Sequence, residues 1–280
     1  MSPPPFKIHI LGAGIAGLAT AIPLARAGHH VTISESKPSI SELGAGLQVF
    51  PNAMRIIYAW GLEEALRPLA NEAEVMSVRR FEDGRVLGEI PQNPTMEWEF
   101  GFPSCQVYRP DLQRILHKAA VEAGVVMGFG KKAVQVDVEA GIVEFADERK
   151  VDDADLIVGA DGILSSFREL LPGNAGIKAV SASEFCFRTT VDKAAMLDDP
   201  ETAALMDSRE WMVWCGPGAV VLGYPVNGGS KYNTLISVSH DSDASMSHWS
   251  EAGDLQEARD LVKDFAPAVR KVWNSVSETV

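Results

Sequence analysis

The chain has 280 residues, 46% of them hydrophobic, and its 38 acidic residues outnumber its 25 basic residues, which gives a net charge of −13. A chain of this size can bury a large core, arranged as one large domain or two intertwined domains. The acidic charge, without any lysine- or arginine-rich run, argues against binding to nucleic acid or to an anionic membrane surface.

The two most apolar stretches, residues 8–25 and 211–226, are both interrupted by glycine and proline. Neither is therefore a convincing membrane span. The cysteines, Cys105, Cys186 and Cys215, lie far apart and lack the spacing of a metal site or a redox pair. We expect reduced, mostly buried cysteines rather than reactive thiols, which predicts a cytoplasmic protein without a metal centre.

The first segment predicts half of a dinucleotide-binding fold. Residues 6–11 form a β-rich run, residues 15–27 a helix that ends at Gly28, and residues 31–35 a second strand. A second compact strand-helix-strand unit, expected of a nicotinamide dehydrogenase, does not follow.

Gly12, Gly14 and Gly17 form the pattern G-x-G-x-x-G between the first strand and the helix. Glycines at this spacing let the backbone turn tightly and approach a pyrophosphate at the helix N-terminus. Glu35, at the end of the second strand, can accept hydrogen bonds from both ribose hydroxyls. Because its carboxylate would repel a 2′-phosphate, we expect FAD or NAD at this site and not NADP; glycines that serve only a turn are the alternative.

The rest of the chain alternates between helical and strand patterns. In chain order we expect a glycine-bearing loop at 44–48, a helix from 51 to about 61, short strands over 71–102 with a turn at Asp83-Gly84, a helix from 110, an antiparallel meander over 125–145, a buried strand at 156–160, mainly strands over 181–238, and a last amphipathic helix over 255–265.

Asp161-Gly162 directly follows the strand at 156–160. A carboxylate at the C-terminal end of a strand faces the crevice in which open α/β sheets bind ligands, and Gly162 lets the backbone come close. A simple Asp-Gly turn is the alternative.

These features, in this order, resemble the single-component aromatic hydroxylases of the salicylate hydroxylase type: the glycine motif, Glu35, the helix start Tyr108-Arg109-Pro110-Asp111-Leu112, and Asp161-Gly162. The resemblance implies that Arg109 contacts the FAD pyrophosphate and that Asp161 lies near the ribityl chain. It also implies that the 44–48 loop, with Gly46 and Gln48, lies beside the isoalloxazine. A surface salt bridge is the alternative for Arg109.

The resemblance implies an α/β fold: a Rossmann-like FAD-binding domain of the glutathione reductase type with an inserted, mainly antiparallel β substrate domain. We assign residues 1–70, 101–178 and 251–280 to the FAD-binding domain and residues 71–100 and 179–250 to the substrate domain. The implied reaction uses NADH or NADPH to reduce FAD, after which O2 forms a flavin hydroperoxide that hydroxylates a small phenolic substrate.

Two departures from the family pattern bear on activity. The family carries a downstream Gly-Asp motif followed by a proline, whereas Gly253-Asp254 opens the last amphipathic helix instead. We therefore expect a chain that stops before the C-terminal part of the FAD-binding domain. A truncated, inactive FAD- or nucleotide-binding fragment is the main alternative, and an epoxidase or halogenase on the same fold is a further one.

The second departure concerns the substrate pocket, because Val220 stands where many relatives have a histidine, four residues before the tyrosine of Tyr224-Pro225. Related enzymes use an arginine and a tyrosine to bind or activate a phenolate, which suggests Arg188 and Tyr224 as the catalytic pair. The two-residue period of a strand places Phe185 and Phe187 on one face of the strand and Arg188 on the other. The alternative is a packed Tyr224 and an exposed, unrelated Arg188.

Overall fold

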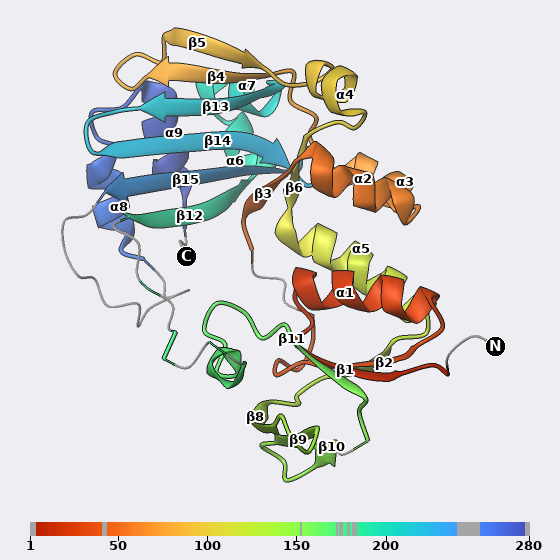
Figure 1. Ribbon diagram of the computed structural model, residues 1–280. Coiled ribbons are helices and arrows are strands. Elements are labelled where there is room, and N and C mark those ends of the chain that lie inside the picture. Colours follow the sequence, from red (N-terminus) through yellow and green to blue (C-terminus); the bar gives the residue numbers. More distant parts are fainter. Residues whose placement is uncertain are drawn as a thin grey trace. The chain divides into compact units, whose positions relative to one another are not determined.

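A computed structural model describes residues 4–40, 44–151, 153–171, 173, 176–177, 180, 184–239 and 253–277 (Figure 1). The chain forms two compact units. The first combines Met1–Glu42 with Leu112–Val180, and the second combines Leu43–Asp111 with Ser181–Val280.

The first unit contains a parallel four-stranded sheet in the order β11-β1-β2-β7. Its elements are β1 (Lys7–Leu11), α1 (Ile15–Arg26), β2 (His30–Ser34), β7 (Val126–Gly128) and β11 (Leu156–Gly159). Four of the five residues of β1 are buried, as expected for the central strand of a covered parallel sheet.

A three-stranded antiparallel sheet lies beside this parallel sheet, formed by β8 (Ala133–Asp137), β9 (Ile142–Phe145) and β10 (Lys150–Val151). Val143 and Phe145 pack with Leu11 of β1 in a small core. A short 3₁₀ helix, η2 (Arg168–Leu170), follows β11. The predicted 125–145 meander is thus wrong for β7, which pairs in parallel with β2. The expected burial of the 156–160 strand is also wrong, because β11 is an edge strand with an exposed Leu156.

The second unit is built on a six-stranded sheet in the order β12-β15-β14-β13-β4-β5. All neighbours are antiparallel except β13 and β4. The strands are β4 (Val75–Arg80), β5 (Val86–Pro91), β12 (Glu184–Asp192), β13 (Glu210–Cys215), β14 (Ala219–Val226) and β15 (Lys231–Ser239).

Helices cover one face of this sheet: α6 (Lys193–Leu197), α7 (Pro200–Met206), α8 (Leu255–Leu261) and α9 (Pro267–Ser275) (Figure 1). Trp273 of α9 is fully buried in the core between helices and sheet, together with Phe187, Met212 and Ile236. The last helix predicted, over 255–265, is confirmed as α8 but ends earlier, at Leu261, and a further helix that was not predicted, α9, begins at Pro267. The opposite sheet face carries the alternate residues of each strand.

The remaining elements of the second unit follow the chain from the glycine-bearing loop. They are β3 (Gly46–Val49), α2 (Pro51–Ala59), α3 (Glu63–Leu66), the 3₁₀ helix η1 (Arg67–Leu69), α4 (Thr95–Phe100), β6 (Cys105–Tyr108) and the start of α5 (Arg109–Glu122), which continues into the first unit. Strands β3 and β6 pair as an antiparallel ribbon beside β14 (Figure 1).

The compact units divide the chain at positions other than those of the predicted domains. The segments 44–70, 101–111 and 253–277 belong with the six-stranded sheet, because the β3–β6 ribbon contacts β14 and α9 completes the core. The functional assignment of the two predicted domains stays a prediction. Among the described residues, no helix is long and apolar enough to cross a membrane, and no group of His, Cys, Asp or Glu side chains could hold a metal ion.

Candidate functional site

The glycine turn of the first unit has the geometry of a phosphate-binding turn. Gly12 has φ +108, and a Cβ at this position would lie 2.4 Å from the carbonyl oxygen of Ala160. A Cβ on Gly17 would lie 2.0 Å from the oxygen of Gly12. Both glycines are thus required by the protein itself, since no side chain fits there.

Gly14 differs from the other two glycines, because a Cβ placed on it would meet no protein atom within 4 Å. It is the N-cap residue of α1, where no side chain caps the helix and the first turn holds no acidic residue. The N-terminal N–H groups of α1 are therefore left for an anion, as dinucleotide phosphates require. This open space at an uncapped helix end fits a pyrophosphate.

Glu35 reaches this turn from the end of β2. Its Oε2 accepts a hydrogen bond from the N–H of Ala13 at 2.8 Å. Its Oε1 accepts from the N–H of Lys37 at 2.9 Å and from the hydroxyl of Ser36 at 3.1 Å. These bonds hold the carboxylate beside the glycine turn with acceptor capacity to spare, where a ribose would need it.

Asp161 and Gly162 also lie at this edge of the sheet. Because β11 pairs in parallel with β1, with Gly159 opposite Leu11, both strands end at the same edge. The Asp161 side chain is exposed, and Gly162 has φ +92, a conformation that favours glycine. The first unit therefore brings together the glycine turn, Glu35 and Asp161-Gly162, which sequence reasoning assigned to one ligand.

The second unit holds the other predicted cofactor residues, Gly46, Gln48 and Arg109. Strand β3 pairs with β6 so that Gly46 lies opposite Tyr108, directly before Arg109. The N–H of Arg109 donates to the carbonyl of Ala45 at 3.1 Å, and its half-buried side chain stands at the start of α5. The 44–48 loop and Arg109 are thus neighbours, although about 60 residues separate them in sequence.

The catalytic pair predicted from sequence shares one face of the six-stranded sheet. Arg188 lies opposite Leu235, which lies opposite Leu222, and Tyr224 lies opposite Asn233. Directly opposed residues point to the same side of an antiparallel pair. Arg188 and Tyr224 therefore both point away from the helix-covered face, with their Cα atoms about 12 Å apart, from two strand spacings of about 4.8 Å and a two-residue offset. The predicted separation of Phe187 from Arg188 is confirmed, because Phe187 lies in the helix-side core.

Tyr224 is buried, and Arg188 is exposed. Burial raises the pKa of the Tyr224 hydroxyl to about 12, and the positive charge of Arg188 partly opposes this rise. At neutral pH Tyr224 is therefore a hydrogen-bond donor, and Arg188 is close enough to act on it electrostatically.

Tyr224 also packs against the predicted cofactor loop. A Cβ on Gly46 would lie 2.7 Å from Tyr224 Cε2, 2.8 Å from its hydroxyl and 2.7 Å from Asn233 Cγ. The N–H of Gly46 donates to Asn233 Oδ1 at 2.5 Å. Glycine is thus needed at position 46 because β3 approaches the six-stranded sheet closely there, which the sequence did not reveal. Asn233, which is 1% exposed, was missed because its partner is remote in sequence.

The cysteines differ from the expectation of general burial. Cys105 is buried, which raises the pKa of its thiol to about 12 and makes it unreactive. Cys186 and Cys215 are exposed. Their register partners Ser237 and Val220 show that both lie on the sheet face that points away from α6, α7, α8 and α9.

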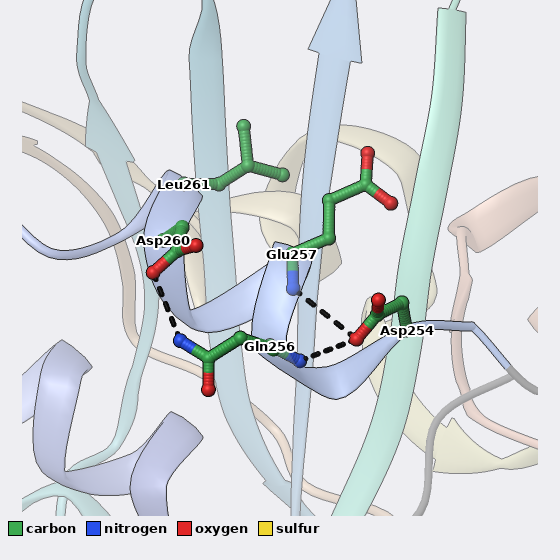
Figure 2. A pocket seen from close by; sticks show the side chains of 5 residues that line it. All are labelled: Asp254, Gln256, Glu257, Asp260 and Leu261. Atoms are coloured by element: carbon green, nitrogen blue, oxygen red, sulfur yellow. Dashed lines mark hydrogen bonds between the residues drawn. The ribbon is translucent and has the colours of Figure 1, made fainter.

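Two cavities among the described residues are lined by none of the predicted site residues. One, of about 380 Å³, lies at α8, where Figure 2 shows Asp254 accepting from the N–H groups of Gln256 and Glu257. Asp254 thus caps α8, in line with the expectation that Gly253-Asp254 opens a helix. This cavity is lined by three carboxylates, from Asp254, Glu257 and Asp260, which would repel a phosphate or phenolate. The other, of about 460 Å³, is lined by Arg67, Ala70, Asn71, Glu72, Glu97, Pro103 and Arg209.

The parallel sheet with its glycine turn, and the Glu35 carboxylate held beside that turn, define a dinucleotide-binding fold, which a second, mainly antiparallel unit accompanies. Residues 6–260 match the family described as FAD binding domain, and the chain belongs to that family. FAD is thus the cofactor, as the sequence predicted.

Characterised relatives are aromatic monooxygenases. The chain is 32% identical over 241 residues to 3-hydroxybenzoate 6-hydroxylase of Polaromonas naphthalenivorans, covering 84% of this chain and 57% of that protein. It is 34% identical over 230 residues to 6-hydroxynicotinate 3-monooxygenase of Pseudomonas fluorescens, covering 79% and 58%. Among solved structures, a salicylate hydroxylase substrate complex matches with a TM-score of 0.73 at 22% identity, covering 98% of this chain and 67% of that one, which confirms the fold. The chain spans 57 to 64% of the length of the first three curated relatives.

Proposed function

We propose that this chain is the FAD-binding and substrate-binding part of a monooxygenase that hydroxylates a small phenolic compound, with NADH or NADPH as the reductant and O2 as the oxidant. The observation that carries the proposal is the placement of Arg188 and the protonated Tyr224 on the same face of one sheet. FAD, when bound, accepts the hydride and activates O2.

Within this proposal, the residues of the chain bind the cofactor and prepare the substrate. Gly14 and Arg109 hold the pyrophosphate, Glu35 the ribose, and Asp161 the region of the ribityl chain. Strand β3, with Gly46 and Gln48, lines the isoalloxazine.

Arg188 and Tyr224 act on the substrate oxygen. The Tyr224 hydroxyl, held in its protonated form, donates a hydrogen bond to that oxygen. The Arg188 guanidinium lowers the pKa of the substrate phenol, because a nearby cation favours the phenolate. A phenolate is richer in electrons at its ring carbons, which makes the ring easier to hydroxylate.

The substrate class follows from the relatives, whose names describe hydroxylation of a hydroxylated aromatic acid or heterocycle. We propose a phenolic compound of comparable size. We also propose a cytoplasmic location, which the three free cysteines support.

The test is an activity screen of the full-length protein loaded with FAD, with salicylate, 3-hydroxybenzoate and larger phenols as substrates. Product formation and NAD(P)H oxidation are measured separately. Arg188→Gln and Tyr224→Phe should each slow hydroxylation and move its pH profile, while NAD(P)H oxidation continues without product.

Two controls make the same chemical changes on the helix side of the sheet. Arg270→Gln alters an exposed cation of α9, and Tyr232→Phe alters a core tyrosine; neither should affect the pH profile. If Arg188→Gln and Tyr224→Phe hydroxylate as fast as the parent with the same pH profile, the assignment of this pocket is wrong. If no phenol is hydroxylated, the proposed reaction is wrong.

A further inference from the structure

A chain of side-chain hydrogen bonds passes through Gln48, the residue of β3 expected beside the flavin. Asn71 Nδ2 donates to Gln106 Oε1 at 2.9 Å, and Gln106 Nε2 donates to Gln48 Oε1 at 2.9 Å. Gln48 Nε2 then donates to the hydroxyl oxygen of Ser104 at 2.8 Å. The Ser104 hydroxyl donates to Gln92 Oε1 at 3.4 Å. All five residues belong to the second unit.

Most of this chain is inaccessible to solvent. Gln106 and Ser104 are both 0% exposed and Gln92 is 3% exposed, whereas Gln48 is only half-buried. Buried amides are costly unless their donors and acceptors are paired, and a fully paired network rigidifies its members. Gln48 is therefore held by two hydrogen bonds while its side chain stays partly open to a ligand; Asn71, at the far end of the network, is the other half-buried member.

The direction of the hydrogen bonds is determined at the Gln92 end. Gln92 Nε2 donates to the carbonyl oxygen of Pro91 at 3.3 Å, so its Oε1 is the atom that faces Ser104. Ser104 must then donate to Gln92 and accept from Gln48. Gln48 consequently turns its Oε1 to the Nε2 of Gln106. If every hydrogen bond ran in the opposite direction, the Gln92 amide would be turned over and its Oε1 would face the carbonyl oxygen of Pro91, with no hydrogen between the two oxygens.

A primary amide has two N–H donors, and the described bonds use one of the two on Gln48 Nε2. We infer that Gln106 is a positioning residue, which with Ser104 orients the Gln48 carboxamide so that its second N–H donates to an oxygen of the bound ligand. This inference rests on the proposed function, which brings β3 to the site. The acceptor is either a flavin carbonyl or the oxygen of the phenolic substrate.

The test compares Gln106→Met and Gln106→Glu with the parent, each loaded with FAD. Methionine keeps the approximate volume of the side chain and removes both hydrogen bonds. Gln48 then keeps only its hydrogen bond to Ser104 and loses the partner that fixes its Oε1. The affinity for the ligand that Gln48 contacts should therefore fall by about 5- to 10-fold, the factor that one neutral hydrogen bond is worth. If the ligand is FAD, the visible absorption band of the bound flavin should also shift.

The Gln106→Glu variant provides a readout that a merely structural residue would not give. A protonated carboxyl group at this position can donate to Gln48 Oε1 as the amide of Gln106 does, whereas an ionised carboxylate cannot. The Gln106→Glu protein should therefore behave like the parent at low pH and like Gln106→Met at high pH. Thr202→Val is the matched control, because it removes a buried hydrogen bond of 2.5 Å to the carbonyl of Met196 without touching this network.

The two ligand sources are distinguished by titrating FAD alone and then 3-hydroxybenzoate into the FAD-loaded protein. A change in flavin spectrum and flavin affinity identifies a flavin oxygen, and a change only in 3-hydroxybenzoate affinity identifies the substrate oxygen. If the parent binds FAD but Gln106→Met changes none of these quantities, the inference fails alone. If the parent binds no FAD, the proposed function fails and the inference with it.

Discussion

Gly46→Ala tests the close approach between β3 and the six-stranded sheet. The added methyl would lie 2.7 Å from Tyr224 Cε2 and from Asn233 Cγ, well inside van der Waals contact. Neither neighbour is the flexible end of a long side chain, and Asn233 is fixed by its bond to the Gly46 N–H. Overpacking of this kind costs about 1–3 kcal/mol, and loss of the hydrogen bond adds about 1 kcal/mol. We therefore expect a loss of about 2–4 kcal/mol in the free energy of unfolding.

Tryptophan fluorescence during urea denaturation reports on the unit that contains Gly46, because all six tryptophans fall in the sequence ranges of the second unit. Gly88→Ala is the matched control, since a Cβ on Gly88 of β5 meets nothing within 4 Å; it should leave the midpoint unchanged or raise it. In a double-mutant cycle, Tyr224→Ala should cost less in the Gly46→Ala background, because the methyl and the ring compete for one space. Equal midpoints for Gly46→Ala and Gly88→Ala would refute the reasoning.

Three further predictions concern single charged groups. Glu35→Ala should weaken FAD binding by about 10- to 100-fold through loss of charge-assisted hydrogen bonds, and a flavin titration that gives equal affinities would remove Glu35 from the site. The Glu210 carboxylate is half-buried, and hydrogen bonds from Ser77 and Arg79 outweigh desolvation and lower its pKa below 4.5. The ionised Glu210 therefore stabilises the fold fully above pH 4.5, and this contribution is lost as the pH falls through the pKa of the folded state. The difference in urea midpoint between the parent and Glu210→Gln should shrink on acidification. A difference that stays constant with pH would contradict this. Burial lowers the pKa of His9, a residue of the first unit, below 6.5, so the stability of that unit should fall as the pH drops below 6.5. His9→Gln should flatten that slope in urea unfolding followed by circular dichroism, because the tryptophans fall in the second unit.

Local patterns predicted the parts of the site that depend on neighbours in sequence. The spacing of Gly12, Gly14 and Gly17 predicted the turn, and the two-residue period predicted the face of Arg188. Both follow from backbone geometry, which a short segment determines by itself.

What the sequence did not reveal depends on contacts between distant segments. Strand β7 was misassigned because its parallel partner β2 is about 90 residues away, and parallel pairing leaves no turn signal. The hydrogen bonds of Gln106 and Asn233 to β3 were missed for the same reason. Gln106 lies 58 residues from its partner Gln48, and Asn233 lies 187 residues from its partner Gly46. A glutamine in the otherwise apolar, buried run of β6 was the signal that could have pointed to Gln106.

The most direct test of a flavin site at the glycine turn is the FAD affinity of Gly14→Ala. The protein has room for this methyl, since a Cβ meets nothing within 4 Å, and Gly14 has φ −68, which alanine adopts readily. Only a ligand lying close to the turn would exclude it. We predict an unchanged unfolding midpoint with FAD affinity reduced by at least about 10-fold, whereas Gly17→Ala should unfold the first unit, because its Cβ would lie 2.0 Å from the Gly12 oxygen. Equal FAD affinities for the parent and Gly14→Ala would contradict the account, because no phosphate could then lie against this turn.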